Sequence, residues 1–164
     1  MSHIRYKGAQ TLPPNWTIEQ RNIPTTVQLF RYSAITWNTH RIHYDQAYAR
    51  SEGYPDILVQ SHLHGAFLTK LCTDWAGSPE RLLRLQVSVR RFAVPGDVLI
   101  SRARIIEETT ESNQTVVGLE LEEIRENDEV VCATGHATVV IPEMELDARI
   151  SGPAVSHGED MEGR

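Results

Sequence analysis

Between residues 82 and 141 apolar and polar residues alternate, which is the period of a β-strand with one buried face. In the first stretch, Leu83, Leu85, Val87 and Val89 would share one face, with the polar residues between them on the other. Four stretches carry the pattern: RLLRLQVSVRRFAV, DVLISRARIIEET, QTVVGLELEEIREN and EVVCATGHATVVI. Turn-forming residues separate them at 95–97, 110–113 and 127–128. The sequence therefore predicts a meander of four long antiparallel strands in a strongly curved sheet.

A helical period precedes the strands and predicts one long helix at about 62–76. Ser61 is the predicted N-cap and Gly77 the predicted terminator. Apolar residues cover much of this helix, so we expect it to be buried: Leu63, Ala66, Phe67, Leu68, Leu71 and Trp75. Upstream we predict a first strand within WTIEQRNI, a helix at about 26–36 begun by Thr25 or Thr26, and a helical turn at 46–50.

A buried helix followed by an antiparallel sheet makes an α+β protein in which the sheet wraps the helix, the hotdog architecture. We expect one domain over 16–142, a flexible lead-in at 1–15, and a disordered or loosely attached acidic tail at 143–164. Such a sheet leaves an edge strand, and pairing with a second subunit is a common way to cover it. A homodimer with sites between its subunits is therefore the expected assembly.

Composition and charge narrow the classes of function. The formal net charge of −6 disfavours a nucleic-acid duplex as partner. No apolar run approaches the roughly 18 residues of a membrane span, and MSHIRYKGAQ lacks the apolar segment of a signal peptide, so we expect a soluble, cytoplasmic protein. Cys72 and Cys132 are predicted to be buried free thiols, because their number and spacing suit neither a disulfide framework nor a zinc site.

Arginines gather between residues 81 and 104, against the acidic balance of the whole chain. The six are Arg81, Arg84, Arg90, Arg91, Arg102 and Arg104. They form either a solvated strand face or a surface that meets the phosphates of a nucleotide-bearing group such as coenzyme A.

Residues 38–45, NTHRIHYD, gather groups suited to proton chemistry behind the predicted helix 26–36. The surrounding stretch, LFRYSAITWNTHRIHYDQAYARSEGYPDILVQSHL, resembles the MaoC-like acyl thioester hydratases and dehydratases. It is similar to the branch that contains mesaconyl-C4-CoA (3-methylfumaryl-CoA) hydratase, itaconyl-CoA hydratase and mitochondrial-type 3-hydroxyacyl thioester dehydratases. The resemblance covers about residues 20–142, including FAVPGDVL and VVCATGHATVV. It implies a hotdog lyase that hydrates an enoyl thioester, or dehydrates a 3-hydroxyacyl thioester, on coenzyme A or acyl carrier protein.

In such enzymes an aspartate and a histidine flank the water and the substrate double bond. The resemblance places this histidine at His43, whereas Asn38 occupies the position of the aspartate. An amide can orient water or substrate but cannot accept a proton at a useful pH. Proton transfer is therefore assigned to His43, with His40 or Asp45 as candidate helpers. Because an unperturbed imidazole has a pKa of about 6.5, one histidine can deprotonate the water and then return the proton.

The start of the buried helix is the predicted thioester-binding element. Its unpaired N–H groups, around Gln60, Ser61 and His62, can bond the thioester oxygen as negative charge develops there. In the related enzymes this start reads Gly-Pro or His-Gly. Here it reads Gln60-Ser61-His62, so the sequence does not define how the N–H groups would be arranged around the thioester oxygen.

Several polar residues have two interpretations. His43 is either the acid/base or a core histidine bonded to a carbonyl oxygen. Arg31 and Arg41 either face a substrate carboxylate or form ordinary salt bridges, and Asp45 either assists His43 or caps the turn 46–50. His62 and His64 lack the i, i+4 spacing of a metal pair. Because no ligand cluster or phosphate-binding glycine motif is present, we expect no metal and no bound cofactor, with coenzyme A entering only as part of the substrate.

Two rival functions share the expected fold. Hotdog proteins also hydrolyse acyl thioesters, typically with a carboxylate. Asn38 alternatively suits a non-catalytic acyl-thioester-binding subunit that has lost its carboxylate and pairs with another hotdog subunit in a hetero-oligomer. The acyl group itself is not specified by the sequence.

Overall fold

A five-stranded antiparallel sheet with the strand order β1-β3-β4-β5-β2 forms the body of the protein. The structure, a computed structural model, describes residues 16, 18–111 and 113–151. The strands are β1 (Ile18–Asn22), β2 (Leu82–Val89), β3 (Leu99–Glu111), β4 (Gln114–Arg125) and β5 (Val130–Pro142). The helices are α1 (Thr26–Ile35), α2 (Gln46–Ser51), α3 (Ser61–Ala76) and α4 (Glu143–Ser151), with short 3₁₀ turns at Arg41–His43 and Pro79–Arg81.

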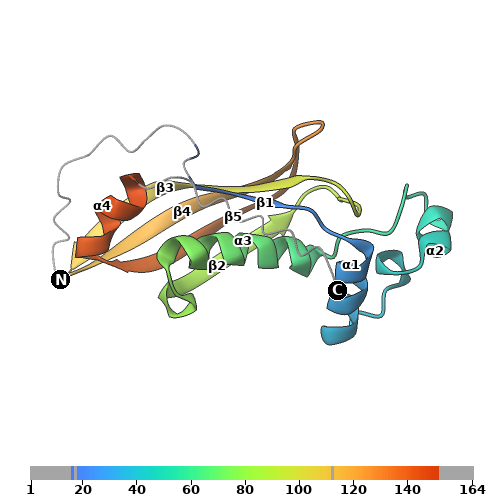
Figure 1. Cartoon of the computed structure of the whole chain (residues 1–164), viewed down its shortest axis with the longest axis horizontal. Coiled ribbons are helices and arrows are strands. Elements are labelled where there is room, and N and C mark those ends of the chain that lie inside the picture. Colours follow the sequence, from blue (N-terminus) through green and yellow to red (C-terminus); the bar gives the residue numbers. More distant parts are fainter. Residues whose placement is uncertain (1–15, 17, 112, 152–164) are drawn as a thin grey trace, which may run out of the picture.

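Helix α3 lies along one face of the curved sheet, with α1 and α2 at one end of the molecule and α4 at the other (Figure 1). Leu68, Leu71 and Trp75 of α3 are buried against sheet residues such as Leu119 and Val139. The sheet therefore wraps the long helix, and the predicted α+β hotdog fold is confirmed.

A second apolar cluster fixes the segments that surround the start of α3. Leu29 of α1, Ala49 of α2 and Ile57 of the connecting segment pack with Leu63 and Phe67 of α3. Leu29 and Ala49 have no exposed surface. The loops that carry the candidate residues are therefore attached to the core at the N-terminal end of α3.

The strand order differs from the predicted meander. Strands β3, β4 and β5 are consecutive neighbours, but β2 pairs with β5 and β1 pairs with β3, so β1 and β2 form the two edges. Alternation along each strand reports burial and carries no information about which strand is its neighbour. Gly135 permits the close β2–β5 pairing, because a Cβ at this position would collide with the backbone oxygen of Gln86.

One side chain of β2 lies on the face opposite to the predicted one. The pairing register shifts between Leu82 and Arg84, which is a β-bulge, and Leu83 at the shift is 58% exposed. Leu82, Leu85 and Val87 pack against the core instead. The bulge breaks the strict alternation on which the prediction rested.

At most helix ends the capping residue is the one predicted from the sequence. The Thr25 side chain accepts a bond from the Gln28 amide at the start of α1, and Gly77 ends α3 with φ of 84°. The prediction that Ser61 is the N-cap of α3 is wrong, because helical geometry already includes Ser61 and the N-cap residue is Gln60. The Gln60 side chain makes no capping bond.

The tail 143–164, predicted to be disordered or loosely attached, is helical in its first part. Helix α4 covers Glu143–Ser151 and places Leu146, 9% exposed, in the core. Arg81 and Arg149 both bind Glu145 and lower the pKa of this carboxyl to about 2. They also donate to backbone oxygens at the end of α3, so α4 is tied to that helix. The predictions for residues 1–15 and 152–164 lie outside the described residues.

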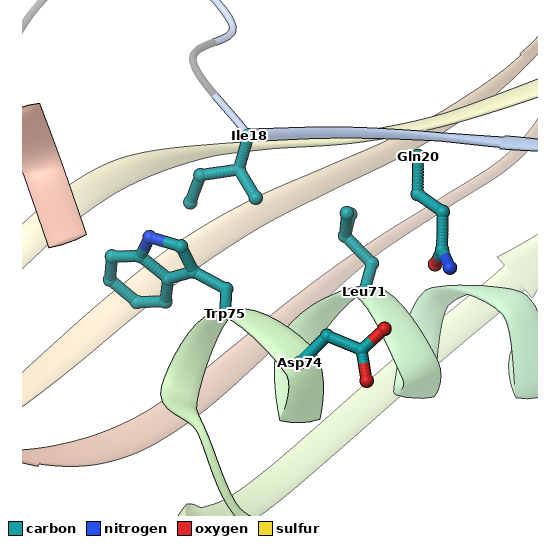
Figure 2. Close-up of a pocket in the computed structure, with 5 residues that line it drawn as sticks. All are labelled: Ile18, Gln20, Leu71, Asp74 and Trp75. Carbon is teal, nitrogen blue, oxygen red and sulfur yellow. The ribbon is translucent and has the colours of Figure 1, made fainter. Parts of the chain in front are cut away.

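The far end of α3 packs under β1 without forming a ligand site. Ile18 and Gln20 of β1 face Leu71, Asp74 and Trp75 of α3 across a hollow that is too narrow to hold a water molecule (Figure 2). Elsewhere in the core, Cys72 and Cys132 are free and buried, as predicted. Burial raises the pKa of the Cys72 thiol to about 12, so it remains protonated at neutral pH.

Candidate functional site

His43 lies at the end of the 3₁₀ turn Arg41–His43, with 8% of its surface exposed. Its Nδ1 is 2.8 Å from the backbone oxygen of Leu58, and the Leu58 amide donates to the oxygen of Ile42. A carbonyl oxygen only accepts, so Nδ1 carries the proton and Nε2 of the neutral ring is a free acceptor. Within the described chain no group hydrogen-bonds to Nε2. The ring is therefore held in the tautomer that a general base requires.

The surroundings of His43 favour its neutral form. Burial is the largest cause of a lowered pKa, the bond to Leu58 opposes it, and the neighbouring His40 lowers the pKa further. The His40 ring is exposed and lies edge-on to His43, with ring centres 5.8 Å apart. At neutral pH the imidazole of His43 is therefore ready to accept a proton.

Asn38 shapes the loop that precedes His43. Its backbone N–H donates to the oxygen of Ser33 at 2.9 Å, and its side-chain Oδ1 accepts a bond from the His40 amide at 3.2 Å. Trp37, immediately before it, has φ of 52°, a conformation that a bulky residue seldom adopts. The oxygen of the half-buried Asn38 side-chain amide is thus hydrogen-bonded within the loop, whereas its NH₂ group has no partner among the described residues.

The arginines of this region differ in their contacts. Arg41 binds Asp45 at 2.6 Å and stacks over the Tyr48 ring at 4.5 Å. Asp45 caps α2 by accepting from the Tyr48 amide at 3.0 Å, which confirms its predicted capping role. The Tyr48 amide, and then Arg41, hold the pKa of Asp45 below its usual value. Arg31 is exposed on α1 and makes no ion pair with any described residue. Of the two arginines, only Arg41 is therefore ion-paired within the described part of the chain.

The start of α3 exposes two of the three predicted thioester-binding residues. Ser61 and His62 are exposed, and no hydrogen bond joins their backbone N–H groups to described residues. They border a groove of about 690 Å³, within the size range of small-molecule sites. The groove is lined by Tyr32, Ser61, His62, Gly65, Ala66, Thr69, Leu85, Val87 and Val89.

Gln60, the third predicted residue, points away from the groove. It has no exposed surface, and its Nε2 donates to the Leu29 oxygen and to Ser33 Oγ, both at 2.8 Å. Its side chain is therefore an internal link between α1 and α3. Direct contact of this side chain with substrate in the groove would require both bonds to break.

The candidate residues fall into two neighbouring groups. Asn38, His40 and His43 form one group, whereas Ser61 and His62 belong to the groove, whose lining does not include His43. The buried segment 57–60 joins the groups, because it carries the oxygen that binds His43 and leads directly into α3. Within the described part of the chain, no cluster of three His, Cys, Asp or Glu side chains is placed to hold a metal ion.

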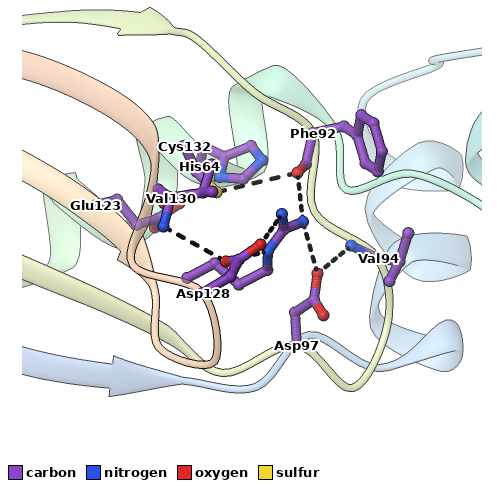
Figure 3. Close-up of polar contacts among 9 residues, drawn as sticks. His64, Phe92, Val94, Asp97, Glu123, Asp128, Val130 and Cys132 are labelled. Carbon is purple, nitrogen blue, oxygen red and sulfur yellow. Dashed lines mark hydrogen bonds and ion pairs between the residues drawn. The ribbon is translucent and has the colours of Figure 1, made fainter.

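A buried ionisable pair was missed by the sequence interpretation. His64 on α3 and Glu123 on β4 are 1% and 0% exposed at their side chains, and their Nδ1 and Oε1 atoms form a short hydrogen bond. Figure 3 shows the two residues beside Cys132 and near a set of polar contacts that includes Asp97 and Asp128. The signal was present in the sequence, because Glu123 continues the buried alternation of Leu119 and Leu121.

Comparison with known proteins identifies relatives of this chain. A family model described as hydroxyacyl-thioester dehydratase type 2 matches residues 3–92. The chain is 41% identical over 70 residues to mesaconyl-C(4)-CoA hydratase of Chloroflexus aurantiacus, a match that covers 42% of this chain and 25% of that protein. It is 44% identical over 69 residues to the mitochondrial hydroxyacyl-thioester dehydratase type 2 of Schizosaccharomyces pombe, covering 37% of this chain and 23% of that protein.

The matched segment thus spans about a quarter of the length of these curated relatives. Among solved structures, the R-hydratase PhaJ1 of Pseudomonas aeruginosa superposes with a TM-score of 0.68 at 19% identity. The superposition covers 76% of this chain and 79% of that chain, which supports the fold.

Proposed function

This chain belongs to the hydroxyacyl-thioester dehydratase type 2 family, and from that premise we propose that it is a hydro-lyase acting on acyl thioesters. The reaction is the reversible addition of water to an enoyl thioester, which gives a 3-hydroxyacyl thioester. One observation carries the proposal: His43 is buried, with Nδ1–H bound to the Leu58 oxygen and Nε2 free to accept a proton. A histidine that served only the core could make the same bond to a carbonyl oxygen, so it is the free Nε2 that supports the role of base.

In the proposed mechanism, His43 Nε2 removes a proton from water while the water oxygen bonds to the β-carbon of the enoyl group. Electrons of the double bond move toward the thioester, so that negative charge develops on its oxygen. The N–H groups of Ser61 and His62 stabilise that oxygen at the positive end of α3. The imidazolium of His43 then returns the proton to the α-carbon, and the ring is neutral again. The Asn38 NH₂ group orients the water or a substrate oxygen without taking a proton.

The thioester carrier is proposed to be coenzyme A or an acyl carrier protein, present as part of the substrate. Three of the six clustered arginines are already ion-paired to glutamates: Arg81, Arg102 and Arg104. The other three, Arg84, Arg90 and Arg91, are exposed and form no ion pair with a described residue. Their charge is available to the carrier's phosphate groups.

A homodimer is part of the proposal. Strand β2 is an edge of the sheet, and it exposes Leu83 and Val89 by 58% and 37%. Pairing of β2 with its copy in a second subunit would cover this edge and close the groove that β2 borders. Sedimentation of the purified chain tests this, with Leu83→Lys expected to shift the mass from dimer to monomer. A monomeric wild-type chain would contradict it.

No described helix is both long and apolar enough to cross a membrane. A cytoplasmic location remains a prediction, and one relative in the family is a mitochondrial protein. Fractionation of cells that express a tagged chain would test the location.

The reaction is tested by incubating the chain alone with crotonyl-CoA and with an itaconyl or mesaconyl thioester. Hydration predicts loss of the enoyl absorbance without release of free thiol. Release of thiol with the conjugated chromophore retained would assign the protein to the thioesterases instead. A chain that becomes active only when mixed with another hotdog subunit would favour the accessory-subunit alternative.

A further inference from the structure

The pair formed by His64 and Glu123 lies beside the proposed thioester-binding site. His64 belongs to the first turn of α3, which also carries Ser61 and His62. Its ring points into the core, where Glu123 Oε1 bonds Nδ1 and Ser101 Oγ donates to Glu123 Oε2 at 3.1 Å. All three side chains are buried, at 1% exposure or less. The first turn of α3 is thus bonded directly to strand β4 and, through Glu123, to strand β3.

Stability alone does not account for this arrangement. Two ionisable groups lose their hydration when buried, and replacing a buried pair by apolar residues of similar size is often neutral or stabilising. The nearby contacts of α3 with the sheet are apolar, through Leu68 and Leu71. A hydrogen-bonded pair differs from such contacts because it is directional, so it restricts the position of the helix turn more narrowly.

A chain of bonds connects the pair to the loop of the proposed base. The backbone N–H of Asn38 donates to the backbone oxygen of Ser33, and Ser33 Oγ accepts from Gln60 Nε2. The backbone oxygen of Gln60 in turn accepts from the backbone N–H of His64. Gln60 Oε1 and His64 Nε2 are buried and have no partner among the described residues. These two residues are i, i+4 neighbours on one face of the helix start. Buried polar groups without a partner are uncommon in proteins, and two of them lie together at this turn.

We propose that His64, Glu123 and Ser101 are positioning residues for the proposed hydration reaction. They hold the first turn of α3 so that the N–H groups of Ser61 and His62 point at the place where the thioester oxygen becomes negative. The inference rests on the proposed function, and it adds residues that never touch substrate. Because such donors act in the transition state, their displacement lowers kcat and leaves KM nearly unchanged.

The decisive variant is His64→Leu/Glu123→Leu, which replaces both partners and leaves no unpaired charge. We expect a folded protein whose kcat is about tenfold to a hundredfold lower, with KM within about twofold of wild type. Glu123→Gln keeps the size, removes the charge and retains one of the two acceptor oxygens, the other being replaced by an NH₂ donor. This variant is expected to show a smaller loss in kcat. The matched control is Glu122→Gln, because Glu122 is the next residue of β4 and pairs with Arg102.

A second readout needs no turnover. The backbone amide resonances of Ser61 and His62 are expected to shift in Glu123→Gln and to stay in place in Glu122→Gln. If wild type lacks hydratase activity, the proposed function fails, and these resonances still test the positioning. Wild-type kcat in a folded double variant would overturn the inference. Loss of the fold in both Glu123 variants would assign the pair to stability and would overturn it as well.

Discussion

Replacing Gln60 by methionine should loosen α1 from the start of α3. Gln60 is fully buried, and its Nε2 donates two bonds of 2.8 Å, to the Leu29 oxygen and to Ser33 Oγ. Methionine has a similar volume but no donor. The variant therefore removes both bonds while leaving the apolar packing of Leu29 and Leu63 in place.

The magnitude follows from these contacts. Two neutral hydrogen bonds contribute about 1–3 kcal/mol together. The variant also removes Gln60 Oε1, a buried acceptor without a partner, which returns about 1 kcal/mol. The difference is a net decrease of up to about 2 kcal/mol in the free energy of unfolding, centred on about 1 kcal/mol, and we expect Tm to decrease by a few degrees.

Urea unfolding at fixed protein concentration measures the difference. The fluorescence of Trp75, 4% exposed, reports on the core. Gln28→Met is the matched control, because Gln28 is exposed on α1 and should change stability by less than about 0.5 kcal/mol. A Gln60→Met protein as stable as wild type would show that the two bonds do not hold α1 to α3, and would refute this part of the account.

Three further predictions concern the base, the amide and the sheet. Burial lowers the pKa of His43, so kcat/KM should fall on acidification, and the pH at which it reaches half its maximum should lie below about 6.5. A half-maximal pH above that value would contradict the environment described for the ring. Asn38→Asp introduces a second titrating group next to the His43 loop, so the enzyme should stay active but the pH profile of kcat should change shape. An unaltered profile would place Asn38 outside the site. Gly135→Val should lower stability by about 1–3 kcal/mol, because its Cβ would collide with the Gln86 backbone and displace β2, and an unchanged Tm would argue against the close β2–β5 pairing.

Local signals in the sequence predicted most of the secondary structure. The caps Thr25, Asp45 and Gly77 were predictable because each acts on its own neighbours in the chain. The long helix and the long strands followed from their periods. Helix α4 was missed because its acidic, weakly apolar sequence gains stability from distant partners, namely Arg81 and the core contact of Leu146.

Features that depend on contacts between distant segments could not be predicted in this way. The crossing of β2 to β5 and the exposure of Leu83 at the bulge are properties of pairing. In the site, the sequence and the family resemblance assigned His43, but the bond from Nδ1 to Leu58, which selects the ring's basic nitrogen, appears only in the fold. The inward orientation of Gln60 and the burial of His64 against Glu123 likewise depend on how α1, α3 and β4 meet.

The most direct test of the central claim is the rate of crotonyl-CoA hydration by His43→Ala. General acid–base catalysis contributes about 10²–10⁴-fold, so we expect kcat to fall by that factor while the fold is retained. His136→Ala is the control, because His136 is exposed on β5 and lies outside the groove, and it should keep the wild-type rate. A His43→Ala protein that hydrates crotonyl-CoA at the wild-type rate would contradict the assignment of His43 as the base.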